Sequence, residues 1–391
     1  MTRLAVVVSH PIQYYSPLFR ELARRLDLHV FFGQLASPAQ QAAAGFGVPF
    51  DWDVDLLSGY RSTVLKNVAI RPGPGHFLGC DTPEIGAHLR SGDFDGLLVL
   101  GWYLKSFVQA TWAARRLNIP VMIRGDSHLG TPRGLLTRSA KMLAYPPLLR
   151  AFDAALYVGV RSRAYYENYH YPAQRLFFSP HCVDADWFAS RATPESRAMF
   201  RARLGIGPEE KAVLFAGKLL PFKRPLDVVE ACATNGARGA HLVVAGAGEL
   251  ELAMRQRADA LGVMLHLLGF QNQTEMPAAY AAADVLVLPS GRETWGLVAN
   301  EALACGTPII VSDAVGCAPD LAADRVAGRV VPLGDTAVLG RTIGEVLASP
   351  PSAQAIAAKS DTYSLGAAVA GIEAALTALT QRERAGRIGM R

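Results

Sequence analysis

Two glutamates, Glu293 and Glu301, stand eight residues apart in the stretch GRETWGLVANEALACGTP (291–308), where most other residues are small or apolar. A surface helix carrying two solvated acids explains this stretch poorly, because Trp295 and several aliphatic residues flank both carboxylates. Carboxylates in such a setting either exchange protons as a general acid and base or accept hydrogen bonds from hydroxyl groups. The sequence therefore predicts a binding or catalytic role for both residues.

The spacing of the two glutamates decides between these roles. On one helix, eight residues would separate them by about 12 Å along the axis. The paired carboxyl groups of retaining glycosidases lie about 5 Å apart and those of inverting glycosidases about 6.5–9.5 Å apart. A hydrolase pair is therefore disfavoured. A carboxylate can also accept hydrogen bonds from two vicinal hydroxyls.

Two lysines, Lys218 and Lys223, follow the apolar run AVLFAGK (212–218). Lysine is a compact cation that suits phosphate groups, and positive charge stabilises the negative charge that grows on a phosphate leaving group. Gly296 and Leu297 are expected to begin a helix, whose first amides and positive dipole end would face the same anion. The alternative is that two exposed lysines merely follow a strand.

Apolar runs typical of buried parallel strands alternate with helical patterns in two series. The first series comprises 4–10, 96–103, 119–125 and 155–160, and the second comprises 212–218, 241–248, 264–270, 284–290 and 307–313. This alternation predicts two Rossmann-like α/β domains, at 1–185 and 186–364. Ligands of such sheets bind at the carboxyl ends of the strands, where the unusual residues of this chain stand.

Composition excludes several classes of protein. Of the 391 residues, 50% are hydrophobic and 19% charged, which predicts a sizeable core. The net charge of +5 lies in the first half, because residues 1–190 hold 19 Lys+Arg against 14 Asp+Glu. No basic run with interleaved aromatics indicates nucleic acid. Five scattered cysteines without a CxxC pair, no apolar run of membrane-spanning length and no signal sequence favour a cytoplasmic protein.

Several motifs together carry a family resemblance. In chain order they are SPHCVD (179–184), G-K-x4-K (217–223), AGAGE (245–249), GF (269–270), E-x7-E (293–301) and ACGTP (304–308). In this order and spacing they resemble the retaining glycosyltransferases of family four, which have the GT-B fold. The resemblance is specific over residues 175–335 and loose before them. It implies two Rossmann-like, doubly wound domains facing across a cleft, with a final helix (365–391, with its tail) that crosses back to the N-terminal domain.

The resemblance implies roles for the residues of the second domain. Lys218 and Lys223 match the pair that grips the diphosphate of a nucleotide diphosphate sugar. Glu293 matches the residue that binds hydroxyls of the donor sugar, and Glu301 the residue that binds the ribose hydroxyls. Further donor-binding positions by the same matching are Gly217, Gly246, Gly248, Phe270, Gln271, Trp295, Gly296 and Leu297. The family's contacts to the base are largely through backbone, so these residue types do not distinguish uracil from guanine. We expect a UDP-sugar rather than a GDP-sugar.

The first domain is expected to hold the acceptor. The loop SHPIQYYSP (9–17) follows the first strand and offers His10, Gln13 and Tyr14 for sugar stacking and hydroxyl binding. In RGDSH (124–128), either Asp126 or His128 occupies the position at which many family members place a histidine facing the donor sugar.

The expected reaction is transfer of a sugar to a hydroxyl acceptor with retention of configuration. No residue stands out as a covalent nucleophile, so same-face attack is favoured, with the departing phosphate taking the acceptor's proton. FDWDVD (50–55) looks like the metal-binding DxD motif of another fold, but two lysines already serve the diphosphate. We therefore expect neither a metal nor a cofactor.

Other functions and partners stay open at this stage. A nucleotide-sugar 2-epimerase shares the architecture, and a non-catalytic sugar-nucleotide binding protein would keep the same fold. The acceptor could be a glycan, a lipid-linked sugar or a small natural product. The segment LLTRSAKMLAYPPLLR (135–150) is either an ordinary surface helix or a site of peripheral membrane contact, which would place the protein at the inner face of the membrane.

Overall fold

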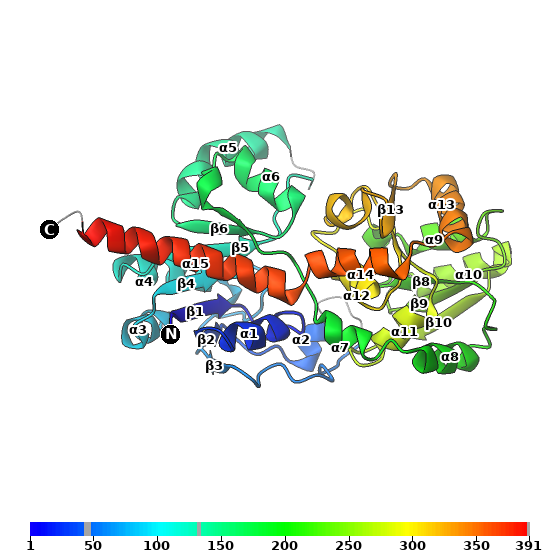
Figure 1. The fold of residues 1–391 in the computed structure, drawn as a ribbon, viewed down its shortest axis with the longest axis horizontal. Helices are drawn as coiled ribbons and strands as arrows, with labels where there is room; N and C mark the ends of the chain where they lie inside the picture. The colour runs from blue at the N-terminus through cyan, green and yellow to red at the C-terminus, as the bar shows by residue number, and fades with distance from the viewer. Residues whose placement is uncertain (43–47, 131–133, 389–391) are drawn as a thin grey trace. The chain divides into compact units, whose positions relative to one another are not determined.

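The computed structural model describes residues 1–42, 48–130 and 134–388, with side chains as far as residue 381. These residues form two compact units. Unit 1 comprises Met1–Ser37, Asp55–His181 and Leu365–Arg391, and unit 2 comprises Pro38–Val54 and Cys182–Ser364. In each unit, helices cover both faces of a parallel sheet (Figure 1). The α/β fold class predicted from the apolar runs is confirmed.

Unit 1 contains a seven-stranded sheet in the order β3-β2-β1-β4-β5-β6-β7. Its strands are β1 (Arg3–Val8), β2 (Asp27–Phe32), β3 (Arg61–Val64), β4 (Gly96–Val99), β5 (Val121–Gly125), β6 (Ala154–Tyr157) and β7 (Leu176–Phe178). Its helices are α1 (Tyr15–Ala23), α3 (Ile85–Gly92), α4 (Lys105–Arg116), α5 (Leu135–Leu149), α6 (Val160–Asn168) and α15 (Leu365–Ile388). The central strands are buried on both faces, which is why they read as continuous apolar runs.

Unit 2 contains a six-stranded sheet in the order β10-β9-β8-β11-β12-β13. Its strands are β8 (Ala212–Ala216), β9 (His241–Ala245), β10 (Leu265–Gly269), β11 (Val285–Leu288), β12 (Ile309–Ser312) and β13 (Gly328–Val331). Its helices are α2 (Pro38–Gln41), α7 (Ala185–Ala189), α8 (Pro194–Arg203), α9 (Pro225–Cys232), α10 (Glu251–Leu261), α11 (Met276–Ala282), α12 (Leu297–Ala304), α13 (Thr336–Ala348) and α14 (Ala353–Thr362).

Each sheet reverses its strand order at one point. In unit 1 the reversal lies between β1 and β4, and in unit 2 it lies between β8 and β11. Crossover helices leave such neighbouring strands toward opposite sides, so their loops separate and leave room for a ligand at the carboxyl ends. His10, Gln13 and Tyr14 follow β1, and Lys218, Lys223 and Glu293 lie in the loops after β8 and β11. The other candidate residues follow β5, β8, β9 and β10 or lie at the start of α12 and within it.

The compact units differ from the expected domains at 1–185 and 186–364 in two places, because unit 2 begins at Cys182 and also includes residues 38–54. Residues 38–54 group with unit 2, although they lie within the first half of the chain. The ring of Phe50 packs on Phe270 with centroids 4.3 Å apart, and Asn272 Nδ2 donates to the carbonyl of Asp51 at 2.8 Å. The carboxylate of Asp53 accepts from the amide of Thr274 at 3.2 Å. The backbone of Asp51 and the carboxylate of Asp53 thus hold this segment to the loop after β10.

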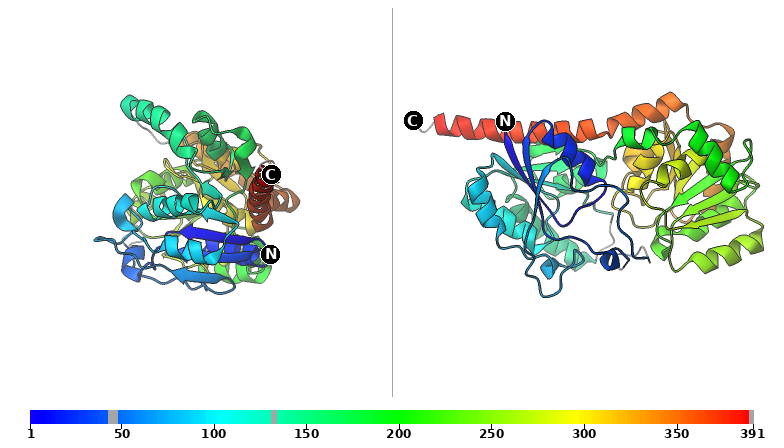
Figure 2. Two further views of the ribbon diagram at one scale, coloured as in Figure 1. Left: turned by 90° about the vertical axis from the view of Figure 1, so that its left-hand side faces the viewer. Right: turned by 90° about the horizontal axis from the view of Figure 1, so that it is seen from below.

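The last helix, α15, packs on α1, β6 and β7 of unit 1 (Figures 1 and 2). Two glycines permit this close approach: a Cβ on Gly371 would lie 1.8 Å from the carbonyl oxygen of Phe178, and one on Gly96 would lie 2.6 Å from Leu376. The hydroxyl of Ser179 also donates to the carbonyl of Ala368 at 2.9 Å.

Among the described residues, one helical stretch, Ala353–Gln381, is long and apolar enough to cross a membrane by length and composition. Polar residues interrupt its apolar runs, so the sequence alone did not indicate a stretch of this length. Ala368, Val369, Ile372 and Leu376 within it are at most 2% exposed. These four residues therefore serve as core in this fold.

Candidate active site

Glycines bring the loops after β8 and β9 together. The amide of Gly217 donates to the carbonyl of Ala245 at 2.9 Å, and the amide of Leu219 donates to Ala247 at 2.9 Å. A Cβ on Gly246 would lie 1.9 Å from the carbonyl oxygen of Gly217, and one on Gly248 would lie 2.6 Å from that of Leu219. Both positions therefore require glycine, and the Gly-rich turn fixes the backbone from which Lys218 projects.

Lys223 lies at the end of a short 3₁₀ helix, Pro221–Lys223, and its Nζ forms an ion pair with Oε2 of Glu293. Both side chains are largely buried, at 16% and 19% exposure. Burial lowers the pKa of Lys218, the charge of Lys223 lowers it further, and the charge of Glu293 raises it. The structure thus brings the two predicted phosphate-binding lysines and the first glutamate into one electrostatic cluster.

Backbone contacts hold the loop that carries Glu293. The amide of Gly291 donates to the carbonyl of Phe222 at 2.8 Å, which ties this loop to the lysine loop. The amide of Gly316 donates to the carbonyl of Glu293 at 3.0 Å. Gly296, with φ of +101°, then turns the chain into α12. As predicted, the helix begins at Leu297, so its first amides lie beside the Glu293 loop.

Glu301 is buried on α12, and its Oε2 accepts a hydrogen bond of 2.6 Å from the hydroxyl of Tyr280. Burial raises the pKa of Glu301 to about 7, while the hydrogen bond from Tyr280 lowers it. The carboxylate is therefore set to gain or lose its proton near neutral pH. Sequence reasoning did not find Tyr280, which lies 21 residues away and has the apolar neighbours of an ordinary core tyrosine.

Other predicted donor-binding residues have different surroundings. Trp295 is 4% exposed, and its Nε1 donates to Oδ1 of Asn300 at 2.8 Å, so its indole belongs to the core. Gln271 donates through its side-chain amide to the carbonyl of Leu268 at 3.0 Å. Trp295 and Gln271 thus offer mainly backbone groups to a ligand, whereas the partly exposed Phe270 stacks on Phe50.

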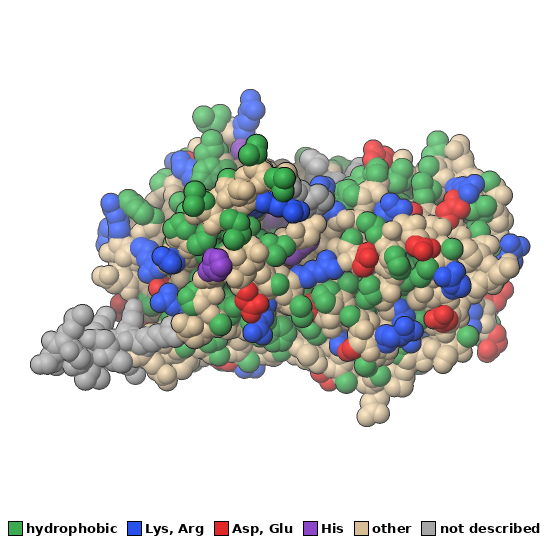
Figure 3. Space-filling view, turned by 90° about the horizontal axis from the view of Figure 1, so that it is seen from above, with side chains coloured by type: hydrophobic (Ala, Val, Ile, Leu, Met, Phe, Trp, Pro, Cys, Tyr) green, Lys and Arg blue, Asp and Glu red, His purple; other side chains and the backbone are tan. Residues whose placement is uncertain are grey.

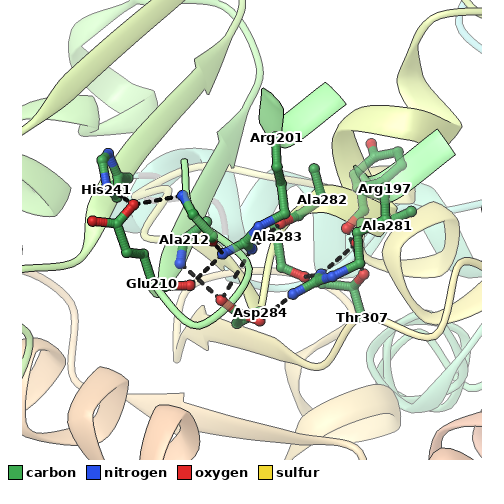
Figure 4. A network of polar contacts seen from close by, with 12 residues as sticks. Arg197, Arg201, Glu210, Ala212, His241, Ala281, Ala282, Ala283, Asp284 and Thr307 are labelled. Atoms are coloured by element: carbon green, nitrogen blue, oxygen red, sulfur yellow. Dashed lines mark hydrogen bonds and ion pairs between the residues drawn. The ribbon is translucent and has the colours of Figure 1, made fainter. Parts of the chain in front are cut away.

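A polar network holds the helix that carries Tyr280. Arg201 donates to the carbonyl of Ala282 at 2.8 Å, at the end of α11, and Arg197 donates to Oδ1 of Asp284 at 2.7 Å (Figure 4). Asp284 lies two residues after the end of α11 and directly precedes β11. These two arginines of α8 therefore fix the end of α11, and with it the place of the Tyr280 hydroxyl.

Unit 1 contains a separate pocket of about 440 Å³ at the carboxyl ends of β1, β4 and β5. Its lining includes Ser9, His10, Tyr14, Tyr15, Trp102, Tyr103, Arg124, Asp126, Tyr165 and Tyr166. Burial lowers the pKa of His10, whose Nδ1 lies 2.9 Å from the hydroxyl of Ser9. Burial raises the pKa of Tyr14 well above its ordinary value. Both groups are therefore uncharged at neutral pH.

Only some of the predicted residues of unit 1 line this pocket. His10 and Tyr14 line the pocket, and Gln13 does not. Of the two alternatives in RGDSH, Asp126 lines the pocket, with one carboxylate oxygen 3.7 Å from Nε2 of His181. His128 lies outside this lining, and its Nδ1 accepts a hydrogen bond of 3.0 Å from the amide of Gly130.

His181 belongs to the motif SPHCVD (179–184). It is buried, lies beside Asp126, and meets the ring of Tyr14 edge-on at 6.2 Å. Arg124, itself buried, donates to the carbonyl of Pro180 at 2.6 Å and so fixes this turn. The only sequence signal was the motif SPHCVD, whose histidine departs from the family's usual asparagine.

A family of known proteins matches most of the second unit. Residues 196–362 match the family described as "Glycosyl transferases group 1". The matched region contains Lys218, Lys223, Glu293, Tyr280 and Glu301, so the cluster described above lies wholly within it.

Curated relatives match part of this chain. A D-inositol 3-phosphate glycosyltransferase of Mycolicibacterium gilvum is 35% identical over 176 residues, which are 41% of this chain and 37% of the relative. The protein of the same name from Mycolicibacterium smegmatis is 37% identical over 179 residues, covering 44% and 39%. The chain thus spans about two fifths of the length of the curated relatives it matches.

Solved structures match the whole chain at low identity. A glycosyltransferase from Rickettsia africae superposes with a TM-score of 0.73 and 12% identity over 97% of this chain and 98% of that one. HepE from Anabaena, solved with UDP-glucose, gives 0.70 and 15% over 97% and 100%. Trehalose 6-phosphate synthase from Burkholderia multivorans gives 0.72 and 14% over 100% and 99%. The expected GT-B fold is confirmed.

Proposed function

We propose that the protein transfers a sugar from a nucleotide diphosphate sugar to a hydroxyl of an acceptor, with retention of configuration and without a metal ion. The observation that carries the proposal is the cluster of Lys218, Lys223 and Glu293 beside the start of α12. Two cations and a helix N-terminus suit a diphosphate, and the adjacent carboxylate suits sugar hydroxyls. Glu301, farther along α12, would accept from the ribose hydroxyls.

The chemistry follows from the charges of this cluster. As the bond between C1 of the sugar and the phosphate oxygen breaks, its electron pair moves to the diphosphate. Lys218 and Lys223 stabilise that charge in a partly buried setting, where electrostatic interactions are stronger than in water. The acceptor oxygen forms the new bond to C1 on the same face, and its proton passes to the departing phosphate.

The acceptor would occupy the pocket of unit 1. Its aromatic walls suit the faces of sugar rings, and Asp126 offers a carboxylate to an acceptor hydroxyl. We favour a UDP-sugar as donor, because the structural relative HepE was solved with UDP and with UDP-glucose. The acceptor is a glycan, a lipid-linked sugar or a small molecule, met in the cytoplasm or at the inner face of its membrane.

Calorimetric titration tests the donor site. UDP, GDP and ADP are titrated, in the presence of EDTA, into the wild type, Lys223→Ala and Glu301→Ala. Lys211→Ala is the matched control, since Lys211 is exposed at the opposite end of β8. We expect UDP to bind without metal and both site variants to bind it more weakly. A strict requirement for Mg²⁺, or equal affinity in all four proteins, would contradict the proposal.

Product analysis tests the reaction. With a radiolabelled UDP-sugar and an acceptor panel, we expect label to appear in a glycoside whose anomeric configuration equals that of the donor. A covalent glycosyl–protein adduct in the mass spectrum would exclude same-face transfer. Conversion of the nucleotide sugar to its 2-epimer in the absence of acceptor would replace transfer with epimerisation.

A further inference from the structure

Two aromatic residues from the first half of the chain, Phe50 and Trp52, lie at the loop after β10. The ring centroid of Phe50 lies 4.3 Å from that of Phe270 and 5.0 Å from that of Trp52. All three side chains are partly exposed. Aromatic rings that gather at the carboxyl end of a strand and stay partly open suit the binding of a flat ring system. The lysine and glutamate chemistry of the site makes no use of these three rings.

Polar contacts hold the segment of Phe50 and Trp52 in place. The side-chain amide of Asn272 donates to the carbonyl of Asp51 at 2.8 Å. The amide of Thr274 donates to the carboxylate of Asp53 at 3.2 Å, and the hydroxyl of Thr274 donates to the same carboxylate. These bonds lie on both sides of residue 52. The backbone, rather than ring packing alone, therefore places both aromatic side chains at the loop after β10.

Backbone hydrogen bonds connect this loop to the predicted diphosphate site. The amide of Gly217 donates to the carbonyl at the end of β9 at 2.9 Å, and the amide of Gly246 donates to the carbonyl of Gly269 at 2.8 Å. Lys218 and Phe270 directly follow the first and the last of these glycines. The ends of β8 and β10 are two strand spacings apart, which is about 10 Å. In a nucleoside diphosphate, a ribose holds the base at a comparable distance from the diphosphate.

The side chains near Phe270 leave stacking as the main contact that they can offer to a base. Gln271 donates its side-chain amide to the carbonyls of Leu268 and Phe270, so its own loop engages it. Charge does not distinguish the bases, because every nucleoside diphosphate carries the same diphosphate. Figure 3 shows Lys and Arg interspersed with Asp and Glu over the face of unit 2 that it presents. Stacking of a base on an aromatic ring changes affinity by roughly ten-fold or more.

We infer that Phe50 and Trp52, together with Phe270, form an aromatic clamp for the base of the donor nucleotide. The inference rests on the proposed function, which places the diphosphate at the lysines and the ribose at Glu301. It extends the donor site to a segment far outside residues 196–362, which match the group 1 family. Residues 48–54 would then contribute to the affinity for the nucleotide, although they come from the first half of the chain.

Titration of the full chain with UDP and with inorganic diphosphate, both in EDTA, separates the base from the diphosphate. Phe50→Ala should raise the Kd for UDP roughly ten-fold and leave the Kd for inorganic diphosphate unchanged. Lys223→Ala should weaken the binding of both ligands. Phe50→Leu keeps an apolar side chain without a ring, so it should resemble Phe50→Ala. Phe50→Tyr keeps the ring and should bind UDP nearly as the wild type does.

Tryptophan fluorescence gives a second readout at the clamp. We expect UDP to quench part of the emission of the wild type, because a base that stacks beside Trp52 quenches its indole. Trp52→Phe should remove this part of the change. The matched control is Trp187→Phe, since Trp187 is another partly exposed tryptophan of unit 2, with the guanidinium of Arg191 4.2 Å from its ring centroid. This control should keep the quenching and the affinity for UDP.

Several results would overturn the clamp while the wild type binds UDP. Equal affinity for UDP in Phe50→Ala and the wild type, or full quenching in Trp52→Phe, would show that the base does not meet these rings. Tighter binding by Phe50→Ala would show that Phe50 fills the place of the base instead. Recovery of UDP affinity in Phe50→Leu, or an equal loss of diphosphate binding in Phe50→Ala, would assign the segment a packing role only. A wild type that binds neither UDP, GDP nor ADP would contradict the proposed function itself, and the clamp with it.

Discussion

The hydroxyl of Tyr280 donates a 2.6 Å hydrogen bond to the carboxylate of Glu301, and both side chains are buried. The bond joins α11 to α12, and the arginines of α8 hold the end of α11 in place. Burial alone would keep Glu301 protonated at neutral pH, whereas the Tyr280 hydrogen bond stabilises its ionised form. Tyr280 is therefore a positioning residue for the carboxylate that we assign to the ribose.

The first prediction concerns the pH dependence of nucleotide binding. The pKa of Glu301 is about 7, so affinity for UDP should fall as the pH drops through 7 and the carboxylate takes up a proton. Tyr280→Phe removes a hydrogen bond that lowers this pKa, so the midpoint should move to higher pH. At pH 7 the dissociation constant should rise roughly ten-fold. Calorimetry across a pH series measures both effects.

The control for this prediction is Tyr171→Phe. Tyr171 is a buried tyrosine of unit 1 whose hydroxyl donates to the carbonyl of Phe152 at 2.9 Å. Its loss costs one buried hydrogen bond without touching Glu301, so the pH midpoint of UDP binding should not move. An unchanged midpoint in Tyr280→Phe as well would refute the positioning role.

A second prediction concerns stability. The pKa of Glu301 is raised from 4.5 in the unfolded chain to about 7 in the native state. The native state therefore binds this proton more tightly, and stability falls as the pH rises from about 4.5 through 7. Glu301→Gln removes the free-energy cost of keeping this buried carboxylate ionised. The variant should be more stable than the wild type by about 3 kcal/mol at pH 8 and by under about 1 kcal/mol at pH 5.

Urea unfolding at the two pH values measures this difference. Glu345→Gln is the control, because Glu345 is exposed on α13 and should show no such pH-dependent gain. The same Glu301→Gln substitution should weaken UDP binding at pH 8. A variant that is less stable than the wild type at pH 8 would show that the buried carboxylate does not carry the penalty.

The third prediction concerns the lysines. Lys218→Ala and Lys223→Ala should each lower kcat/KM by roughly 10²–10³-fold, the scale found when one stabilising group for developing charge is removed. Lys211→Ala should leave the rate unchanged, since Lys211 lies at the other end of β8. Steady-state kinetics with a saturating acceptor measures this. Equal rates in all three variants would exclude the diphosphate assignment.

The alkaline limb of the rate profile gives a fourth prediction. Burial and the neighbouring charge of Lys223 lower the pKa of Lys218. As the pH rises, Lys218 should therefore lose its proton at a lower pH than an ordinary lysine. The rate should fall at the same pH, because the stabilising charge is then lost. In Lys223→Ala the like charge is gone, so the residual activity should fall off at a higher pH. A shift to lower pH would contradict the prediction, because losing Lys223 also frees the carboxylate of Glu293, which raises the pKa of Lys218.

The fifth prediction distinguishes Asp126 from His128. Asp126 lines the pocket of unit 1 and His128 does not. Asp126→Asn should lower kcat roughly 10²-fold with little change in UDP affinity, and His128→Ala should change kcat by less than about five-fold. Comparing kcat, the KM for acceptor and UDP binding separates a role at the acceptor from one at the donor. The reverse ranking would place His128 at the reacting groups.

Sequence reasoning located nine of the thirteen described strands and the loops that carry the candidate residues, because a strand buried on both faces reads as an apolar run. It did not find β2, β3, β7 and β13. It missed contacts that depend on distant segments. Residues 38–54 group with unit 2 because Phe50 meets a phenylalanine from the loop after β10. Trp295, expected at the ligand, turns into the core to bond Asn300. Neither the packing of residues 38–54 nor the burial of the Trp295 indole leaves a periodic signal in the sequence, since both depend on which surfaces the folded chain brings together.

The sequence by itself determined the residue types of the site and their places at strand ends, because local propensity and hydrophobic burial decide where strands stop. Only the tertiary structure decided their electrostatic states. Lys223 and Glu293 pair across 70 residues, and Tyr280 and Glu301 across 21. Desolvation and charge proximity act through space, so the pKa of Glu301 depends on packing against residues that are distant in the sequence. The exposure of leucines on α5 likewise depends on which surfaces the folded chain leaves uncovered.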